Sequence, residues 1–400
     1  MTTLDIDWVR SQFPAFSAEA TADWAHFENA GGSYACRPVI DRLTRFYTER
    51  KMQPYGPAAP SAAGGAEMDE ARRRLARLLG VETEQVAFGP STTQNTYVLA
   101  QAFRSFLKPG DAIVVTDQDH EANSGPWRRL AEAGIEVREW KMDPATGHLD
   151  PEALDALLDE RVRLVCFPHC SNVVGEINPV AEIVARCHAA GAFTCVDGVS
   201  YAPHGLPDVG ATGADVYLFS AYKTYGPHQG IMVMRPALGE LLPNQAHFFN
   251  ADTLYKRFTP AGPDHAQIAA CAGIADYLEA LADRHGVAPE GAHDVMRAAE
   301  VQLLKPLLEA VTNRNDVRLL GPADPGSRAP TVTLSVTRPV EAAEALAERG
   351  IIAGASHFYA VRALQAMGVD PERGVLRLSF THYTSVAEVD RLIGALDEVL

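Results

Sequence analysis

Residues 215–230 read DVYLFSAYKTYGPHQG. The segment begins with an apolar run, typical of a strand that is buried on both faces, and ends in a Gly-Pro turn. Lys223 lies between two tyrosines just after the apolar run ends, where the chain is expected to be inside the fold. A lysine kept from water has a lowered pKa, because desolvation penalises the ammonium form. The neutral amine is a nucleophile, so the segment predicts a reactive lysine at a strand end.

Further apolar runs precede and follow this segment. Most are separated by stretches with helical periodicity, such as PVAEIVARCHAAG at 179–191. Unbroken apolar runs between amphipathic helices predict a mostly parallel sheet that is covered by helices on both faces. The other runs are AIVVTD (112–117), VREW (137–140), RLVCFP (163–168), FTCVDG (193–198) and GIMVMR (230–235).

The pattern changes after about residue 265. A long helical region over 266–312 leads into short strand-like runs such as TVTLSV and VLRLSF, with helices between them. A chain of 400 residues also exceeds the size at which a single core usually keeps growing. We therefore expect a large domain over 20–265 and a smaller α+β domain over 266–400. The N-terminal arm 1–19 is expected to belong to the smaller domain.

Composition excludes several classes of function. A formal net charge of −16 argues against a nucleic-acid partner. No apolar stretch reaches the ~20 residues of a membrane span, and the first residues lack a signal-peptide pattern. The six cysteines form no CxxC pair and are expected to be reduced, buried thiols. The histidines lack metal-ligand spacing, so no metal site is predicted. A cytoplasmic protein is the expectation.

Polar residues follow the predicted strands where parallel sheets bind ligands. Each has an ordinary interpretation as a helix cap, a turn residue or a structural histidine. Together they supply a hydroxyl-lined helix N-terminus for a phosphate, a carboxylate for a heteroaromatic cation, and an amine. Pyridoxal 5′-phosphate (PLP) requires these groups. The segments are STT (91–93), DHEANSGPW (119–127), HCSNVVGEINP (169–179), Asp197, and Ser220 with Lys223.

At these residues the sequence resembles the class V aminotransferase family of fold type I PLP enzymes, in its cysteine desulfurase-like branch. The likeness runs from HFENAGGSYACRPVI (26–40) to VLRLSFTHYTSVAEVDRL (375–392), and it is most specific over residues 196–230. It implies an α/β fold, with a large domain built on a mostly parallel sheet flanked by helices and a smaller C-terminal α+β domain. It also implies a homodimer.

The resemblance assigns roles to particular residues. Lys223 is implied as the Schiff-base lysine, Asp197 as the partner of the pyridinium nitrogen, and His120 as the ring that stacks on the cofactor. The remaining implied cofactor residues are Thr92, Thr93 and Ser220 at the phosphate, Asn172 near the phenolic oxygen and the substrate, and Ser200 and Tyr222. For the substrate, the resemblance implies that Arg377 binds the α-carboxylate and that the backbone at Gly31 and Gly32 approaches closely. His357 and Tyr359 either line the pocket or serve in packing, and both alternatives stay equally open.

The sequence departs from the desulfurase pattern at several positions. The loop GIIAGASHFYAVRALQAMG (350–368) has no cysteine, although desulfurases keep one there to carry the persulfide. Tyr222 stands where desulfurases have a histidine, and Ser200 where the family has Gln. Gly262 replaces a threonine that reaches the neighbouring subunit's phosphate.

We therefore predict a PLP-dependent enzyme that acts on a small α-amino acid. Desulfurase-like C–S cleavage by β-elimination is the first hypothesis, and class V transamination is the alternative. Both reactions need the same electron sink, so the residues do not separate them. Racemisation, aldol cleavage or decarboxylation, and a non-catalytic relative of the fold, stay open as well.

Overall fold

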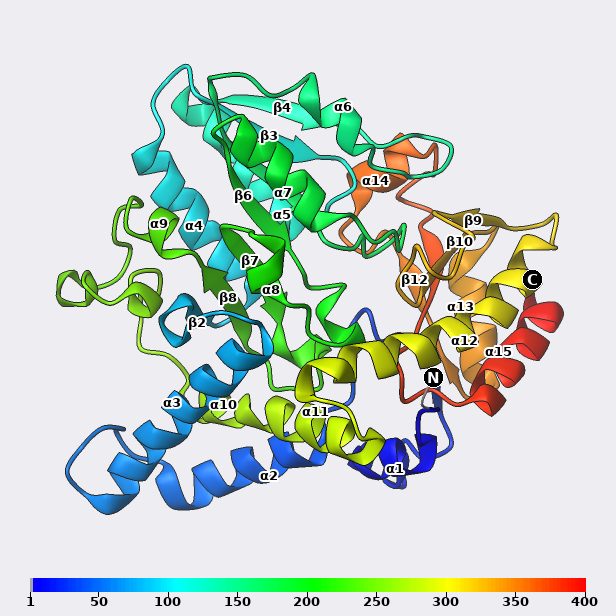
Figure 1. Ribbon diagram of the computed structural model, residues 1–400. Coiled ribbons are helices and arrows are strands. Elements are labelled where there is room, and N and C mark those ends of the chain that lie inside the picture. Colours follow the sequence, from blue (N-terminus) through cyan, green and yellow to red (C-terminus); the bar gives the residue numbers. More distant parts are fainter. Residues whose placement is uncertain (1–2) are drawn as a thin grey trace.

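The structure, a computed structural model, describes residues 3–400 (Figure 1). Residues 1 and 2 of the predicted arm lie outside the described part. The strands are β1 Ala25–His26, β2 Val86–Gly89, β3 Ala112–Thr116, β4 Glu136–Trp140, β5 Val162–Pro168, β6 Phe193–Asp197, β7 Val216–Ser220, β8 Gly230–Met234, β9 Arg318–Leu320, β10 Thr331–Ser335, β11 Ile351–Ile352, β12 Gly354–Ser356 and β13 Val375–Ser379. The helices are α1 Ile6–Ser11, α2 Arg37–Arg45, α3 Ala59–Leu78, α4 Thr92–Phe106, α5 Glu121–Arg128, α6 Pro151–Asp155, α7 Val180–Ala189, α8 Val209–Thr212, α9 Pro236–Gly239, α10 His265–Ala270, α11 Ala272–His285, α12 Ala292–Thr312, α13 Pro339–Glu348, α14 Val361–Ala366 and α15 Val386–Val399.

A seven-stranded sheet forms the centre of the molecule, in the order β2-β8-β7-β6-β5-β3-β4. Strands β7, β6, β5, β3 and β4 pair in parallel, and β8 pairs antiparallel with both β7 and β2. The predicted mostly parallel sheet flanked by helices is confirmed. Parallel pairing brings the carboxyl ends of β5, β6 and β7 to one edge of the sheet.

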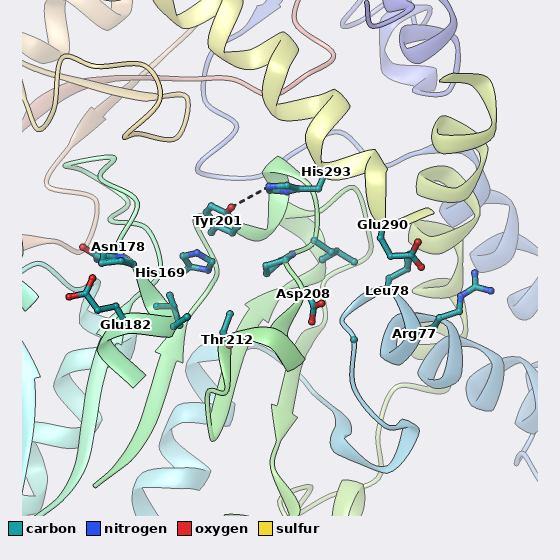
Figure 2. Close-up of a pocket in the computed structure, with 16 residues that line it drawn as sticks. Arg77, Leu78, His169, Asn178, Glu182, Tyr201, Asp208, Thr212, Glu290 and His293 are labelled. Atoms are coloured by element: carbon teal, nitrogen blue, oxygen red, sulfur yellow. Dashed lines mark hydrogen bonds between the residues drawn. The ribbon is translucent and has the colours of Figure 1, made fainter. Parts of the chain in front are cut away.

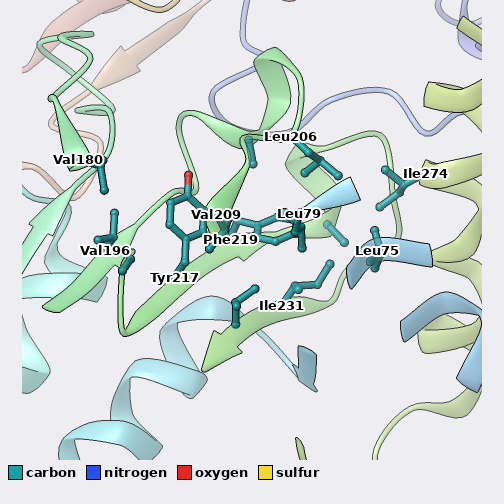
Figure 3. Packing of buried hydrophobic residues seen from close by; sticks show 14 of the residues in the cluster. Leu75, Leu79, Val180, Val196, Leu206, Val209, Tyr217, Phe219, Ile231 and Ile274 are labelled. Atoms are coloured by element: carbon teal, nitrogen blue, oxygen red, sulfur yellow. The ribbon is translucent and has the colours of Figure 1, made fainter. Parts of the chain in front are cut away.

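Apolar side chains alternate between the two faces of this sheet. Tyr217 and Phe219 of β7 join one core cluster, and Val216 and Leu218 join another on the opposite face. Figure 3 shows the first cluster, where Phe219 and Ile231 of the sheet pack near Leu75 and Leu79 from the α3 segment. Burial on both faces explains why the strands read as unbroken apolar runs rather than as alternating ones.

A second, four-stranded antiparallel sheet in the order β12-β13-β10-β9 lies at the C-terminal side of the molecule (Figure 1). Helix α15 packs against α12 and α13, and α13 also packs against β13. The N-terminal strand β1 pairs in parallel with β11. The chain then continues beside β13, where Glu28 bridges to Ser379. This pairing positions the loop after β1 next to the strand that carries Arg377.

Helices α10 and α11 pack against α2 and α3, beside the large sheet. The exact division of the chain at residue 265 therefore stays a prediction. Within residues 3–400, no helix combines the length and the apolar character needed to cross a bilayer.

Candidate active site

A narrow cavity of about 70 Å³ lies at the carboxyl ends of β5, β6 and β7, and we call it the inner cavity. Every residue that the sequence assigned to the cofactor lines it: Thr92, Thr93, His120, Asn172, Asp197, Ser200, Ser220, Tyr222 and Lys223. These side chains are up to 131 positions apart in sequence (223 against 92), and parallel strand pairing brings them together.

The N-terminus of α4 forms one end of the inner cavity. Ser91 caps this helix by accepting a hydrogen bond from the Gln94 backbone N–H at 3.1 Å. The hydroxyls of Thr92 and Ser220 are 2.8 Å apart, which joins the helix to the end of β7. A Cβ at Gly230 would lie 2.6 Å from the Thr92 nitrogen, so only glycine lets β8 pass this close. The result is a helix N-terminus that presents hydroxyls and backbone N–H groups, which suits an anion.

Lys223 follows β7 and faces this cavity together with Asp197. It keeps some surface toward the cavity itself, but protein atoms surround it, and burial lowers the pKa of Lys223 to about 8. The Arg377 charge adds to this pKa shift, while Asp197 and Glu28 oppose it. Burial raises the pKa of Asp197 to about 6, against the hydrogen bond from the Val199 backbone N–H at 2.8 Å. The site therefore holds an amine that is easily deprotonated beside a buried carboxyl group.

His120 forms the N-cap of α5 at the mouth of the inner cavity. Burial, with the charges of Lys223 and Arg377, lowers the pKa of His120 to about 3, so its ring is neutral at pH 7. Its Nδ1 accepts a hydrogen bond from the Ala122 backbone N–H at 3.0 Å. The ring proton must then be on Nε2. A neutral, fixed ring of this kind is suited to stacking on a flat aromatic ligand.

Asp119 also lines the inner cavity, and sequence reasoning missed it. Its Oδ2 accepts from the Asn123 side chain at 2.8 Å, and its Oδ1 is buried without a partner among the described residues. Burial, and the charge of Asp197, raise the pKa of Asp119 well above the usual range of a carboxyl group. Its position directly before His120, at the end of a strand, was the available signal.

Tyr222 occupies the position where desulfurases have a histidine, and it contacts a histidine elsewhere. Its ring stacks on that of His228, with centroids 4.8 Å apart and planes within 8°. Gly32 also lies close to the Tyr222 ring, because a Cβ at Gly32 would be 3.5 Å from a ring carbon. Aromatic packing thus fixes the residue that precedes Lys223.

A wider cavity of about 550 Å³, which we call the outer cavity, adjoins the inner one and shares Thr93, His120, Asn172, Tyr222 and Lys223 with it. Of the predicted substrate residues, Gly31, Asn172, Tyr359 and Arg377 line it. The described residues that line it do not include His357, whose Nδ1 accepts from the Tyr359 backbone N–H at 3.1 Å. Any substrate role of His357 stays a prediction.

The loop before Arg377 has an unusual backbone. Phe358 and Tyr359 both have positive φ angles, 50° and 56°, in a region that costs energy for residues other than glycine. The Phe358 carbonyl accepts from the Asn172 side chain at 2.9 Å, and the Arg377 guanidinium lies 3.7 Å from the centre of the Phe358 ring. Tyr359 instead faces His120, with ring centroids 5.4 Å apart. The loop therefore places two aromatic rings on the outer cavity, and sequence reasoning missed Phe358.

A further cavity, of about 640 Å³, lies away from these residues (Figure 2). His169, Tyr201 and His293 lie along it, and the Tyr201 hydroxyl is 3.4 Å from His293 Nε2. None of the residues that the sequence assigned to cofactor or substrate lines it. This cavity is larger than the inner one, but several residues of the inner cavity have strongly shifted pKa values. Shifted pKa values indicate a reactive site better than volume does.

The sequence model of the Aminotransferase class-V family matches residues 25–392. The chain belongs to the class-V aminotransferase family. It is an enzyme of this family, whose members depend on PLP and act on small amino-acid substrates. The resemblance seen in the sequence is thereby confirmed.

Individual relatives extend over the whole chain. An aminotransferase-like protein, FGM3, from Gibberella zeae is 34% identical, with 100% of this chain and 99% of that protein covered. A cysteine desulfurase from Pectobacterium atrosepticum is 30% identical, with 98% of each covered. Among solved structures, the apo cysteine desulfurase of Thermococcus onnurineus NA1 gives a TM-score of 0.87 at 23% identity, covering 100% of this chain and 98% of that one. This structural likeness supports the fold type I architecture.

Proposed function

We propose that this protein binds PLP through Lys223 and catalyses β-elimination, including C–S cleavage, on a small α-amino acid. The observation that carries the proposal is the inner cavity, in which a half-buried lysine of lowered pKa and a buried aspartate share one space with a helix N-terminus. Strongly shifted pKa values in a cleft are a mark of functional sites.

The residues of the inner cavity fit the cofactor in each of its parts. Thr92, Ser220 and the N–H groups of α4 would bind the phosphate. Asp197 would hold the proton on the ring nitrogen, and the neutral His120 ring would cover one face. The Oδ1 of Asn172 is buried and has no hydrogen-bond partner within residues 3–400, so it could accept a hydrogen bond from a polar group of the cofactor. When bound, PLP acts as an electron sink that acidifies the α-proton of an amino acid.

The chain's own groups would do the rest of the chemistry. Lys223, once its amine is free, is the base placed to remove the α-proton, because its pKa of about 8 lies close to neutral pH. Arg377, at the outer cavity, would bind the α-carboxylate through its planar fork. The backbone at Gly31 approaches the same space.

The cysteines favour direct release of the leaving group over transfer to a protein thiol. All six are buried and free. Cys170 lines the inner cavity, but burial raises the pKa of its thiol to about 12, and its Sγ is 3.4 Å from the Gly175 carbonyl oxygen. A protonated thiol is a poor nucleophile. Together with the cysteine-free loop 350–368, this supports elimination without a persulfide carrier.

Transamination is the second candidate, and the similarity to an aminotransferase-like protein favours it. Incubation of the PLP-loaded protein with cysteine, serine and alanine separates the two. Elimination predicts sulfide and pyruvate from cysteine, and pyruvate from serine, with the cofactor recovered unchanged. Accumulation of pyridoxamine phosphate without these products would instead support transamination and contradict the first proposal.

We also propose a homodimer in the cytoplasm. Phe248 and Phe249 are 87% and 69% exposed, a degree of exposure that a second subunit would reduce. A Cβ at Gly262 would meet no atom of the described residues within 4 Å, so this position faces open space within the subunit. Light scattering of the purified protein checks the subunit number, and a monomeric mass would contradict the dimer.

A further inference from the structure

Arg377 is already bound to a carboxylate of the protein itself. Its Nη2 donates to Glu28 Oε1 at 2.6 Å, and its Nη1 donates to the Asn172 backbone carbonyl at 3.1 Å. Its Nε is buried and has no partner among the described residues. The Phe358 ring covers a face of the guanidinium at 3.7 Å. A ligand carboxylate must therefore approach the edge of the guanidinium that carries Nε and Nη2, and Glu28 already binds Nη2.

The position of Glu28 is built into the fold. The residue before it donates its backbone N–H to Ile352, and Glu28 itself bridges to Ser379, two residues after Arg377 on the same strand. Two glycines surround the carboxylate. A Cβ at Gly31 would lie 2.9 Å from Oε1, and a Cβ at Gly354 would lie 2.6 Å from Oε2. Side chains at these positions would displace the carboxylate, so the backbone leaves room for it where it meets Arg377.

The Glu28 carboxylate is only partly satisfied by this arrangement. Oε1 has Arg377 as its partner, but Oε2 is buried and unpartnered among the described residues. The pair is therefore monodentate, whereas a free carboxylate can bind a guanidinium with both oxygens. The side chain of Glu28 is 23% exposed and that of Arg377 is 4% exposed, so Glu28 lies on the side of the pair that is open to the cavity.

We propose that Glu28 is a resident competitor that the substrate's α-carboxylate replaces on Arg377, and that this exchange sets substrate affinity and selectivity. The inference rests on the proposed function, because it assumes that Arg377 is the carboxylate clamp. Glu28 thereby weakens the binding of carboxylates, rather than strengthening it by holding Arg377 in place.

The exchange also determines the class of substrate. The displaced Glu28 carboxylate stays tethered to the backbone beside the outer cavity, and Glu121 lines the same cavity. A substrate with a second carboxylate would meet this negative charge, since like charges in a confined site repel each other. The site therefore selects amino acids with a neutral side chain over aspartate and glutamate.

The test measures binding of propionate and of L-alanine to the PLP-loaded protein, by calorimetry and by the change in visible absorbance. We expect Glu28→Gln to bind propionate about tenfold more tightly than the wild type, because the competing charge is removed. Glu121→Gln is the matched control: it removes the same charge from the same cavity, but Glu121 lies 3.5 Å from Arg362 rather than at Arg377. Its gain should be less than about threefold. Glu28→Gln should also reduce the preference for L-alanine over L-aspartate.

Weaker or unchanged propionate binding in Glu28→Gln would overturn the inference, because it would mean that Glu28 positions Arg377. An equal gain in Glu121→Gln would also overturn it, because the effect would then be general electrostatics. If Glu28→Gln does not fold, Glu28→Asp serves instead, since its shorter side chain retracts the carboxylate and should also tighten binding. Failure of the wild type to bind PLP would sink the proposed function instead, and absorbance of the loaded protein reports that separately.

Discussion

The inner and outer cavities adjoin each other but are built in different ways. The inner cavity is lined by residues at the ends of β5, β6 and β7 and at the start of α4, all attached to one sheet with its core packed on both faces. The outer cavity is completed by three segments that are distant in sequence: the loop after β1, the loop at 356–359, and β13. The first arrangement is suited to a fixed cofactor, and the second leaves substrate recognition to loops.

The two cavities also differ in backbone conformation and in the charge of their residues. The inner cavity has a neutral histidine and a lysine of lowered pKa, both held by regular elements. The outer cavity contains two consecutive residues with positive φ and an arginine paired with Glu28. Strained backbone tends to occur where function requires it. We conclude that changes in the outer cavity should alter substrate affinity and leave cofactor binding intact.

The largest expected effect comes from Arg377→Ala. Removal of the guanidinium should weaken amino-acid binding by about 2–5 kcal/mol, the range for truncating one partner of a buried charge pair. The protein should still take up PLP, as its visible absorbance reports, because Arg377 does not line the inner cavity. Titration with L-alanine, followed by absorbance, measures both quantities. Loss of PLP together with substrate affinity would contradict the separation of the two cavities.

The second prediction concerns pH and the cofactor-free protein. In the folded state Lys223 has a pKa of about 8, below the ordinary 10.5, so the folded protein binds fewer protons than the unfolded chain between these values. The free energy of unfolding should therefore rise with pH across this window, by up to about 3 kcal/mol. Urea unfolding at several pH values measures the rise, and Lys223→Met should abolish it. An equal rise in that variant would mean that other groups cause it.

The smallest expected effect comes from Phe358→Leu. This change removes the aromatic face from Arg377, and carboxylate affinity should fall by about 1 kcal/mol. Tyr359→Leu is the matched control, because Tyr359 lies in the same loop but faces His120. Its effect on propionate binding should be smaller. If the control weakens propionate binding as much as Phe358→Leu does, the loop as a whole, rather than the ring on Arg377, determines affinity.

The same difference between the cavities explains what the sequence could predict. Apolar runs mark strands, and polar residues at strand ends identify the inner cavity, so its lining could be read from local patterns. Asp119 was missed although it precedes His120 after a strand, because its burial beside Asp197 appears only in the fold. Glu28 could not be assigned, because only the pairing of β1 with β11 brings it to Arg377. Phe358, rather than His357, lines the outer cavity. This arrangement depends on positive φ angles that the residue types do not predict.

The most direct test of the account is to locate PLP on the chain. Borohydride reduction of the loaded protein fixes the cofactor to the amine that holds it, and mass spectrometry of a digest then identifies the residue. The account predicts modification of the peptide that contains Lys223, and none of that peptide in Lys223→Ala. Modification of another lysine in the wild type, or a protein that takes up no PLP, would contradict it.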